Sequence, residues 1–191
     1  MKGLTANILT LILSLTSTSV TALDVNGVEI PETVLQDGSD ITLVLNGAGV
    51  RRKFFFDIYV GALYLAERSG NSIEVIMDSS PKRVILHFLY SEIEQKKMQS
   101  AWREGFEDNS SDAELAELDN EINTFNSAFG DTVQGDVVVI DFLPDNMTRV
   151  EINGIQKVNI ESPDFQRALL SVWLGDSPVD GSLKRGMLGR D

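Results

Sequence analysis

The sequence predicts an α+β fold in which an antiparallel β-sheet carries helices packed on one face. Short apolar segments with a two-residue period fill the first half of the chain, and helical periods begin near residue 91 before strands return. Regular alternation of strands and helices is absent, which argues against a parallel, doubly wound sheet. The 191 residues, 42% of them hydrophobic, are enough for one domain with a substantial core.

Residues 1–22 have the features of a secretory signal peptide. Lys2 precedes an apolar run over residues 8–15, and small residues follow it as far as Ala22. The run is too short to span a bilayer, which takes about 20 apolar residues. We therefore expect the segment to be removed and residues 23–191 to form a single exported domain, which would be periplasmic in a bacterium with two membranes. The alternative is that residues 1–22 stay attached as an uncleaved N-terminal anchor.

The first half of the mature chain is expected to supply most of the sheet. Asn26-Gly27 between alternating apolar residues indicates a tight hairpin within residues 23–35. Gly47-Ala48-Gly49 interrupts the next strand, and glycines in a strand indicate a bulge or a close approach by another segment. Both faces of the strand at 83–90 are apolar, so it should be covered on both sides. The other strands of this half are expected at residues 41–45, at 53–65 as one long strand or two, and at 73–77.

The second half begins with a change to helical periodicity. Ser91 and Glu94 have the spacing of a capping box for a helix that reaches Phe106. An amphipathic helix follows over residues 113–129, with acidic residues on its outer face. Ser162-Pro163 starts a later helix, because proline is favoured at the first helical position. The remaining elements are expected to be strands at 137–143, 149–152 and 155–160 and a short helix at 182–188.

Composition excludes several classes of function. The net charge of −13 and the pI of about 4.4 argue against nucleic acid as a partner and against docking on an anionic membrane surface. The chain has no cysteine and a single histidine, His87, so we expect no thiolate or histidine-rich metal site. A lone general base at His87 remains open beside an ordinary strand histidine. Gly47-Ala48-Gly49 lacks the third glycine and the helix of a dinucleotide site, and no cofactor is expected.

Arg51 is the leading candidate for binding a ligand. It begins a run of three cations, Arg51-Arg52-Lys53, which precedes an apolar and aromatic segment containing Tyr59 and Tyr64. A guanidinium group presents a planar fork suited to a carboxylate. Arg51 and Tyr59 would meet only if the chain turns back near residues 53–56. The alternative is a surface cation that flanks a core strand.

Four motifs resemble the chalcone isomerase superfamily, and most closely its bacterial chalcone isomerase-like branch. They are G-A-G-V-R at 47–51, Y-V-G-A-L-Y-L at 59–65, A-W-R-E-G-F-E-D-N at 101–109 and L-L-S-V-W-L-G-D-S-P-V-D-G-S-L-K-R at 169–185. The resemblance spans nearly the whole mature chain. It implies an antiparallel sheet with helices layered against it and a ligand cleft between them.

The resemblance also implies roles for individual residues. Arg51 looks like the arginine that holds the substrate phenolate in the plant enzymes, which close a chalcone to a flavanone. Tyr59 stands where those enzymes have a threonine, and Val172 stands where they have a second one. The fatty-acid-binding branch of the superfamily keeps an arginine and a tyrosine at the first two positions, so Arg51 with Tyr59 looks like that pair.

The resemblance thus favours an exported, non-catalytic protein that binds a fatty acid or similar amphipathic carboxylate in a cleft between sheet and helices. Arg51 and Tyr59 would hold the carboxylate, and Tyr64 would be a secondary lining residue. One alternative is an isomerase or intramolecular lyase acting on a phenolic or enone substrate. Another is a structural or partner-binding domain whose cleft is collapsed around Phe54, Phe55 or Phe56.

Overall fold

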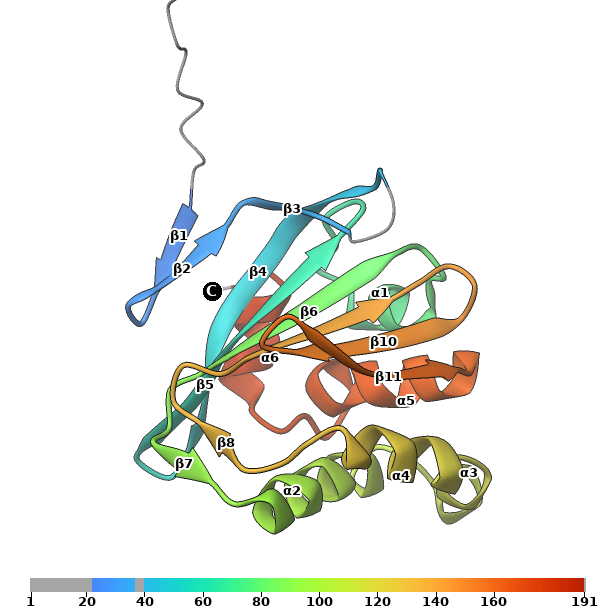
Figure 1. Cartoon of the computed structure of the whole chain (residues 1–191). Coiled ribbons are helices and arrows are strands. Elements are labelled where there is room, and N and C mark those ends of the chain that lie inside the picture. The colour runs from blue at the N-terminus through green and yellow to red at the C-terminus, as the bar shows by residue number, and fades with distance from the viewer. Residues whose placement is uncertain (1–21, 37–39, 191) are drawn as a thin grey trace, which may run out of the picture.

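A seven-stranded antiparallel sheet with helices along one face forms the body of the protein, as the sequence predicts (Figure 1). The computed structural model describes residues 22–36 and 40–190. The strand order is β11-β10-β9-β6-β5-β4-β3, so strands that follow one another in the chain mostly pair with one another. The predicted signal peptide, residues 1–22, lies outside the described residues except for Ala22.

The elements have the following bounds. The strands are β1 (Ala22–Val25), β2 (Val28–Pro31), β3 (Thr33–Leu35), β4 (Thr42–Lys53), β5 (Phe56–Leu65), β6 (Lys82–Phe88), β7 (Glu92–Ile93), β8 (Thr132–Val133), β9 (Val137–Phe142), β10 (Met147–Ile152) and β11 (Ile155–Glu161). The helices are α1 (Ser72–Met77), α2 (Gln95–Glu107), α3 (Asp112–Glu117), α4 (Asp119–Ser127), α5 (Pro163–Leu174) and α6 (Gly181–Met187).

Two hydrophobic cores lie on opposite faces of the sheet. The larger core joins the helices to the sheet and includes Trp102 and Trp173, both buried. The smaller core includes Ile30 of β2 and lies between the β1–β2 hairpin and the other face. Strand β6 is central: Leu86 belongs to the larger core, and Ile85 packs against the smaller one. The prediction that this strand is covered on both sides is therefore confirmed.

The glycines of β4 allow helix α6 to lie directly on the sheet. The register of β4 shifts between Leu45 and Gly47, which confirms the predicted bulge. A Cβ atom at Gly47 would lie 2.0 Å from the carbonyl oxygen of Gly186, and one at Gly49 would lie 3.3 Å from the Cα of Leu183. Any side chain at Gly47 would therefore push α6 away from the sheet.

Residues 73–77 form most of helix α1, so the strand predicted there is wrong. The Oδ1 atom of Asn71 accepts a hydrogen bond from the Ile73 N–H at 3.1 Å and caps the helix. Val75 is buried, whereas Ile73 and Met77 are exposed. The apolar alternation of this segment therefore does not mark two covered faces.

The two predicted helices of the middle region are also corrected. Residues 92–93 pair with β8 as strand β7, so the first helix begins at Gln95 and Ser91 does not cap it. The Gln95 N–H instead donates to Oδ1 of Asp131 at 2.8 Å, a cap supplied from beyond α4. The helix expected over 113–129 is divided at Leu118 into α3 and α4.

A buried ion cluster on the face away from the helices joins three strands. Asp141 of β9 is the direct cross-strand neighbour of both Arg83 in β6 and Arg149 in β10. Arg83 donates two hydrogen bonds to the carboxylate, at 2.7 and 2.9 Å, and Arg149 donates one at 2.8 Å. The Asp141 residue is 1% exposed, so its charge is balanced by these two arginines inside the protein.

Candidate functional site

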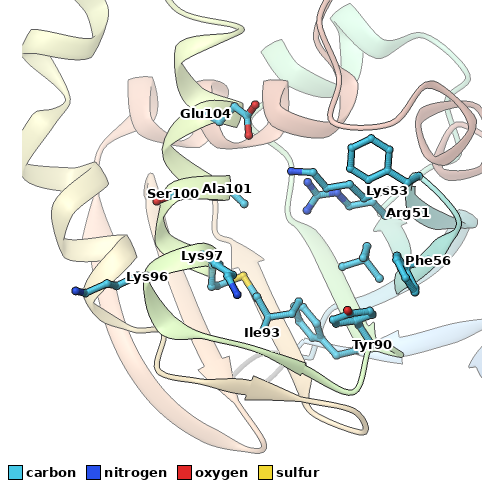
Figure 2. Close-up of a pocket in the computed structure, with 14 residues that line it drawn as sticks. Arg51, Lys53, Phe56, Tyr90, Ile93, Lys96, Lys97, Ser100, Ala101 and Glu104 are labelled. Carbon is cyan, nitrogen blue, oxygen red and sulfur yellow. The ribbon is translucent and has the colours of Figure 1, made fainter.

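A cleft of about 490 Å³ opens between the β4–β5 hairpin and helix α2 (Figure 2). The hairpin supplies one wall and α2 supplies the other, with residues at and after the end of β6 between them. The volume falls in the range of about 300–1,000 Å³ that is usual for small-molecule sites. Much of its lining is apolar: Phe54, Phe56, Ile58, Phe88, Ile93 and Met98.

Arg51 and Tyr59 are direct cross-strand neighbours in the β4–β5 hairpin. The chain turns back at Phe54 and Phe55, which is the turn that Arg51 and Tyr59 need in order to meet. The strand expected to begin at residue 53 therefore begins at Phe56. The Arg51 Cζ atom lies 5.5 Å from the centre of the Tyr59 ring, within the range of a cation–π contact. Arg51 lines the cleft, whereas Tyr59 is 2% exposed and does not.

The guanidinium of Arg51 has unused capacity to bind an anion. Its Nε atom is buried and has no hydrogen-bond partner. Within residues 22–36 and 40–190, no carboxylate makes an ion pair with Arg51. The next residue differs, because Arg52 Nε donates to Oδ1 of Asp57 at 2.8 Å. A register shift between Arg51 and Arg52 separates the two roles.

The Tyr59 hydroxyl is held from the helix side by Trp173 of α5. The indole Nε1–H donates to the Tyr59 Oη at 3.0 Å, and both residues are buried. Burial raises the pKa of the Tyr59 phenol, although the Arg51 charge and the hydrogen bond from Trp173 act to lower it. The phenol is therefore neutral at ordinary pH. Because its oxygen accepts from the Trp173 N–H, the phenol keeps its own hydrogen as a donor.

The charged side chains around the cleft are mainly positive, although the whole chain carries −13. Those that line it are Arg51, Lys53, Lys96, Lys97 and Glu104. Figure 2 shows Arg51 and Lys53 reaching toward the cleft from the hairpin and Glu104 on the facing helix. The arrangement can therefore hold one anionic group next to an apolar wall.

Two residues considered from the sequence lie on the opposite face. Tyr64 belongs to the smaller core, and its hydroxyl donates to the Pro31 carbonyl at 3.0 Å. It is an odd number of residues from Tyr59 along β5, so it does not line this cleft. His87 is next to Phe88 in β6 and likewise points to the other face; burial lowers the pKa of its imidazole. Neither side chain can reach a ligand held by Arg51.

Sequence reasoning missed Trp173 as the partner of Tyr59 and the contribution of α2 to the cleft. A buried indole needs an acceptor for its N–H, and this requirement could have drawn attention to Trp173. The adjacent cations Lys96 and Lys97, just before the apolar Met98, could have indicated a charged rim. The described residues contain no cluster of acidic or histidine side chains able to hold a metal ion. None of the helices in the described segments is both long and apolar enough to cross a bilayer.

Comparisons with known proteins agree with this architecture. Residues 22–189 match the family model described as chalcone isomerase-like. A crystal structure of a fatty-acid binding protein from Arabidopsis thaliana superposes with a TM-score of 0.63 at 16% sequence identity, covering 82% of this chain and 96% of that one. At this identity the likeness shows the fold. Among curated proteins, none matches the sequence significantly.

Proposed function

Because this chain belongs to the chalcone isomerase-like family, we propose that it binds a fatty acid or similar amphipathic carboxylate without catalysis. The observation that carries the proposal is the Arg51 guanidinium, which has a buried Nε without a partner and lies at an apolar cleft of about 490 Å³. Arg51 would bind the carboxylate, and the Tyr59 hydroxyl, which lies behind the cleft lining, would donate a second hydrogen bond to a carboxylate that enters past Arg51. The apolar side chains of the hairpin and α2 would contact the tail.

The chemistry of the pair supports a binding role. A carboxylate accepts strong charge-assisted hydrogen bonds from a guanidinium, and the neutral phenol of Tyr59 can donate to the same group. The Arabidopsis neighbour is named as a fatty-acid binding protein, which is consistent with such a ligand here. Val172 stands where the plant enzymes have a threonine, and it is buried against α2. A valine cannot orient a substrate carbonyl or water, which favours binding over isomerisation.

We further propose that the protein acts after export. The support is the N-terminal sequence, with Lys2, the apolar run at 8–15 and small residues up to Ala22. The mass of the protein recovered after expression in a secreting host should correspond to a chain cleaved close to Ala22. Recovery of the uncleaved chain in the membrane fraction would instead indicate an anchor.

Fatty-acid binding is tested by displacement of a fluorescent fatty acid in solution, together with native mass spectrometry of the purified protein. The wild type should displace the probe with a long-chain fatty acid, and Arg51→Ala should weaken binding roughly 10- to 100-fold, since a hydrogen bond to a charged group contributes about 1.5–3 kcal/mol. Arg52→Ala is the matched control: it removes the same charge from the adjacent residue, whose side chain pairs with Asp57 outside the cleft, and it should bind like the wild type.

Two results would overturn the proposal. One is the absence of fatty-acid binding by the wild type, or equal binding by Arg51→Ala. The other is conversion of a chalcone above its spontaneous rate that is lost in Arg51→Ala, which would make the protein an isomerase.

A further inference from the structure

The turn between β4 and β5 is an exposed aromatic tip, made of Phe54, Phe55 and Phe56. These side chains are 85%, 99% and 54% exposed, and they follow one another in the chain. The turn lies at the end of the hairpin, next to β7 (Figure 1). Single exposed apolar residues are ordinary, but three adjacent phenylalanines on a protruding turn form a surface suited to an apolar partner.

The backbone of the tip gives an independent reason to assign it a role. Phe54 has a φ of +58°, a conformation that glycine and asparagine adopt readily and bulky residues rarely do. In the described residues, the other non-glycine positions with positive φ are all asparagine: Asn26, Asn146 and Asn153. Turn chemistry therefore explains those three positions and does not explain Phe54. Strained residues of this kind concentrate at functional sites.

The exposed cation closest to the tip in the chain is Lys53, because the neighbouring charges are mostly paired. Arg52 is neutralised by Asp57 at 2.8 Å, and Lys97 is neutralised by Glu94 at 2.9 Å. Lys53 follows Arg52 directly and is exposed. Beyond these pairs, the cations of the cleft and the hairpin base are Arg51, Lys53 and Lys96, and the acids there are Glu104 and Asp180. Glu92 of the neighbouring β7 is an exposed acid.

Salt limits the range over which the remaining charges act. Charges farther away than about 8–10 Å are screened at physiological ionic strength, so a surface against the tip is influenced most by Lys53, which directly precedes it. The charge of −13 that argued against an anionic surface therefore applies to the molecule as a whole and not to the tip.

The tip also borders the cleft. Phe54 and Phe56 both line it, and the Phe56 ring contacts the Tyr90 ring edge-on with 5.4 Å between their centres. Tyr90 thereby adds an amphipathic ring beside the phenylalanines, a type of residue that favours the boundary between membrane and water. A surface that covers the tip would lie against the opening of the cleft.

We propose that the aromatic tip docks the protein on a lipid bilayer that carries anionic headgroups. Phe54 and Phe55 enter the boundary between headgroups and acyl chains, while Lys53 lies among the phosphates. Three phenylalanine rings together bury less than the roughly 800 Å² per partner of a standard protein interface, at about 150–250 Å² each. Insertion into a bilayer needs no such area. This docking does not depend on which ligand the cleft holds.

The test is sedimentation of the purified protein with vesicles of phosphatidylcholine, with and without phosphatidylglycerol. The wild type should sediment with the anionic vesicles, and high salt should reduce that binding. Phe55→Ser should reduce the affinity about tenfold or more, because the exposed ring is the part that enters the lipid. Lys53→Glu should also reduce it, whereas Lys157→Glu, the same charge change on β11 at the opposite edge of the sheet, should not. All variants carry the same N-terminal segment, so that segment cannot cause a difference in vesicle binding between them. Such a difference comes from the substituted residue.

Two further variants keep the test independent of misfolding. Phe54→Asn should raise Tm by about 2–4 °C, since asparagine tolerates the left-handed conformation, and yet lose vesicle binding. Phe55→Trp places an indole at the tip, while Trp102 and Trp173 are buried. Its fluorescence should shift to shorter wavelength when anionic vesicles are added.

The proposal is overturned if the wild type does not bind these vesicles or if Phe55→Ser binds them equally well. It is also overturned if the wild type is a dimer that Phe55→Ser converts to a monomer, which would make the tip a contact between copies. Fatty-acid displacement in solution uses no vesicles, so the failure of one proposal is distinguishable from the failure of the other.

Discussion

The guanidinium of Arg51 lies over the ring of its cross-strand neighbour Tyr59, with 5.5 Å between Cζ and the ring centre. The hydroxyl of the same tyrosine accepts a hydrogen bond from the buried indole of Trp173. Arg51 is thus positioned by a residue that is itself fixed from the helical layer. Tyr59 thereby contacts both Arg51 in the cleft wall and Trp173 in the core beneath α5.

Replacing Tyr59 with phenylalanine should weaken both the fold and the binding of a carboxylate. The change leaves the Trp173 N–H buried without an acceptor, which costs about 1–3 kcal/mol of unfolding free energy. For a chain of this size each kcal/mol corresponds to about 2–4 °C in Tm, which calorimetry will resolve. The aromatic ring under Arg51 is kept, so carboxylate affinity should fall by less than it does in Arg51→Ala.

Tyr64→Phe is the matched control for that experiment. It removes the hydrogen bond to the Pro31 carbonyl on the opposite face, so some stability should be lost without any change in affinity for the fatty acid. A loss of affinity in Tyr64→Phe equal to that in Tyr59→Phe would mean that both act through general destabilisation.

Acid should weaken the fold through Asp141. Burial by itself would raise the pKa of this carboxyl, but the hydrogen bonds from Arg83 and Arg149 outweigh it and hold the pKa below its usual value. Such a group contributes stability above its unfolded pKa of about 3.9, and this contribution is lost as the pH falls through the lower folded pKa. The unfolding free energy measured in urea should therefore fall with decreasing pH below about 4.

Asp141→Asn tests this assignment. At neutral pH it should destabilise the protein by about 3–5 kcal/mol, because it removes the carboxylate from two buried arginines. The variant should also lose part of the acid dependence, whereas Asp176→Asn, on an exposed loop, should keep it. An unchanged acid profile in Asp141→Asn would assign the acid sensitivity to other groups.

The contact between β4 and α6 should not tolerate a single methyl group. Gly47→Ala would place its Cβ 2.0 Å from the Gly186 carbonyl oxygen, so α6 must shift and the protein should lose about 1–3 kcal/mol or more. Gly130→Ala is the control, since a Cβ there meets nothing within 4 Å. Chemical denaturation of the two variants measures the difference; equal stabilities would show that α6 rearranges freely.

The fold could be predicted from sequence where local chemistry and tertiary packing agree. Asn26-Gly27 forms its turn, β6 is covered on both faces, and the glycines of β4 mark both a bulge and a close approach. Residues 73–77 were assigned wrongly because their apolar alternation indicated a strand, whereas the Asn71 cap starts a helix that buries little. Similarly, the cap of α2 is Asp131, which the local pattern at Ser91 cannot reveal.

The site was predictable only in part. The pairing of Arg51 with Tyr59 depends on a turn at Phe54-Phe55, and phenylalanines carry none of the usual signals of a tight turn. The second wall of the cleft comes from α2, more than forty residues later in the chain, and its placement is a consequence of packing against the sheet. By contrast, the sequence alone places Tyr64 and Tyr59 on different faces once both are assigned to one strand. Side chains alternate between the two faces of a strand, and these two residues are an odd number of positions apart.

The packing of α6 on the glycines of β4 determines when during synthesis the sheet can be fully covered. Strand β4 ends at Lys53, yet the helix that covers its glycines begins at Gly181. During synthesis from the N-terminus, the hairpin that carries Arg51 therefore stays without this covering layer until nearly the whole chain has emerged. The strand that is made early is therefore one of the last to complete its packing.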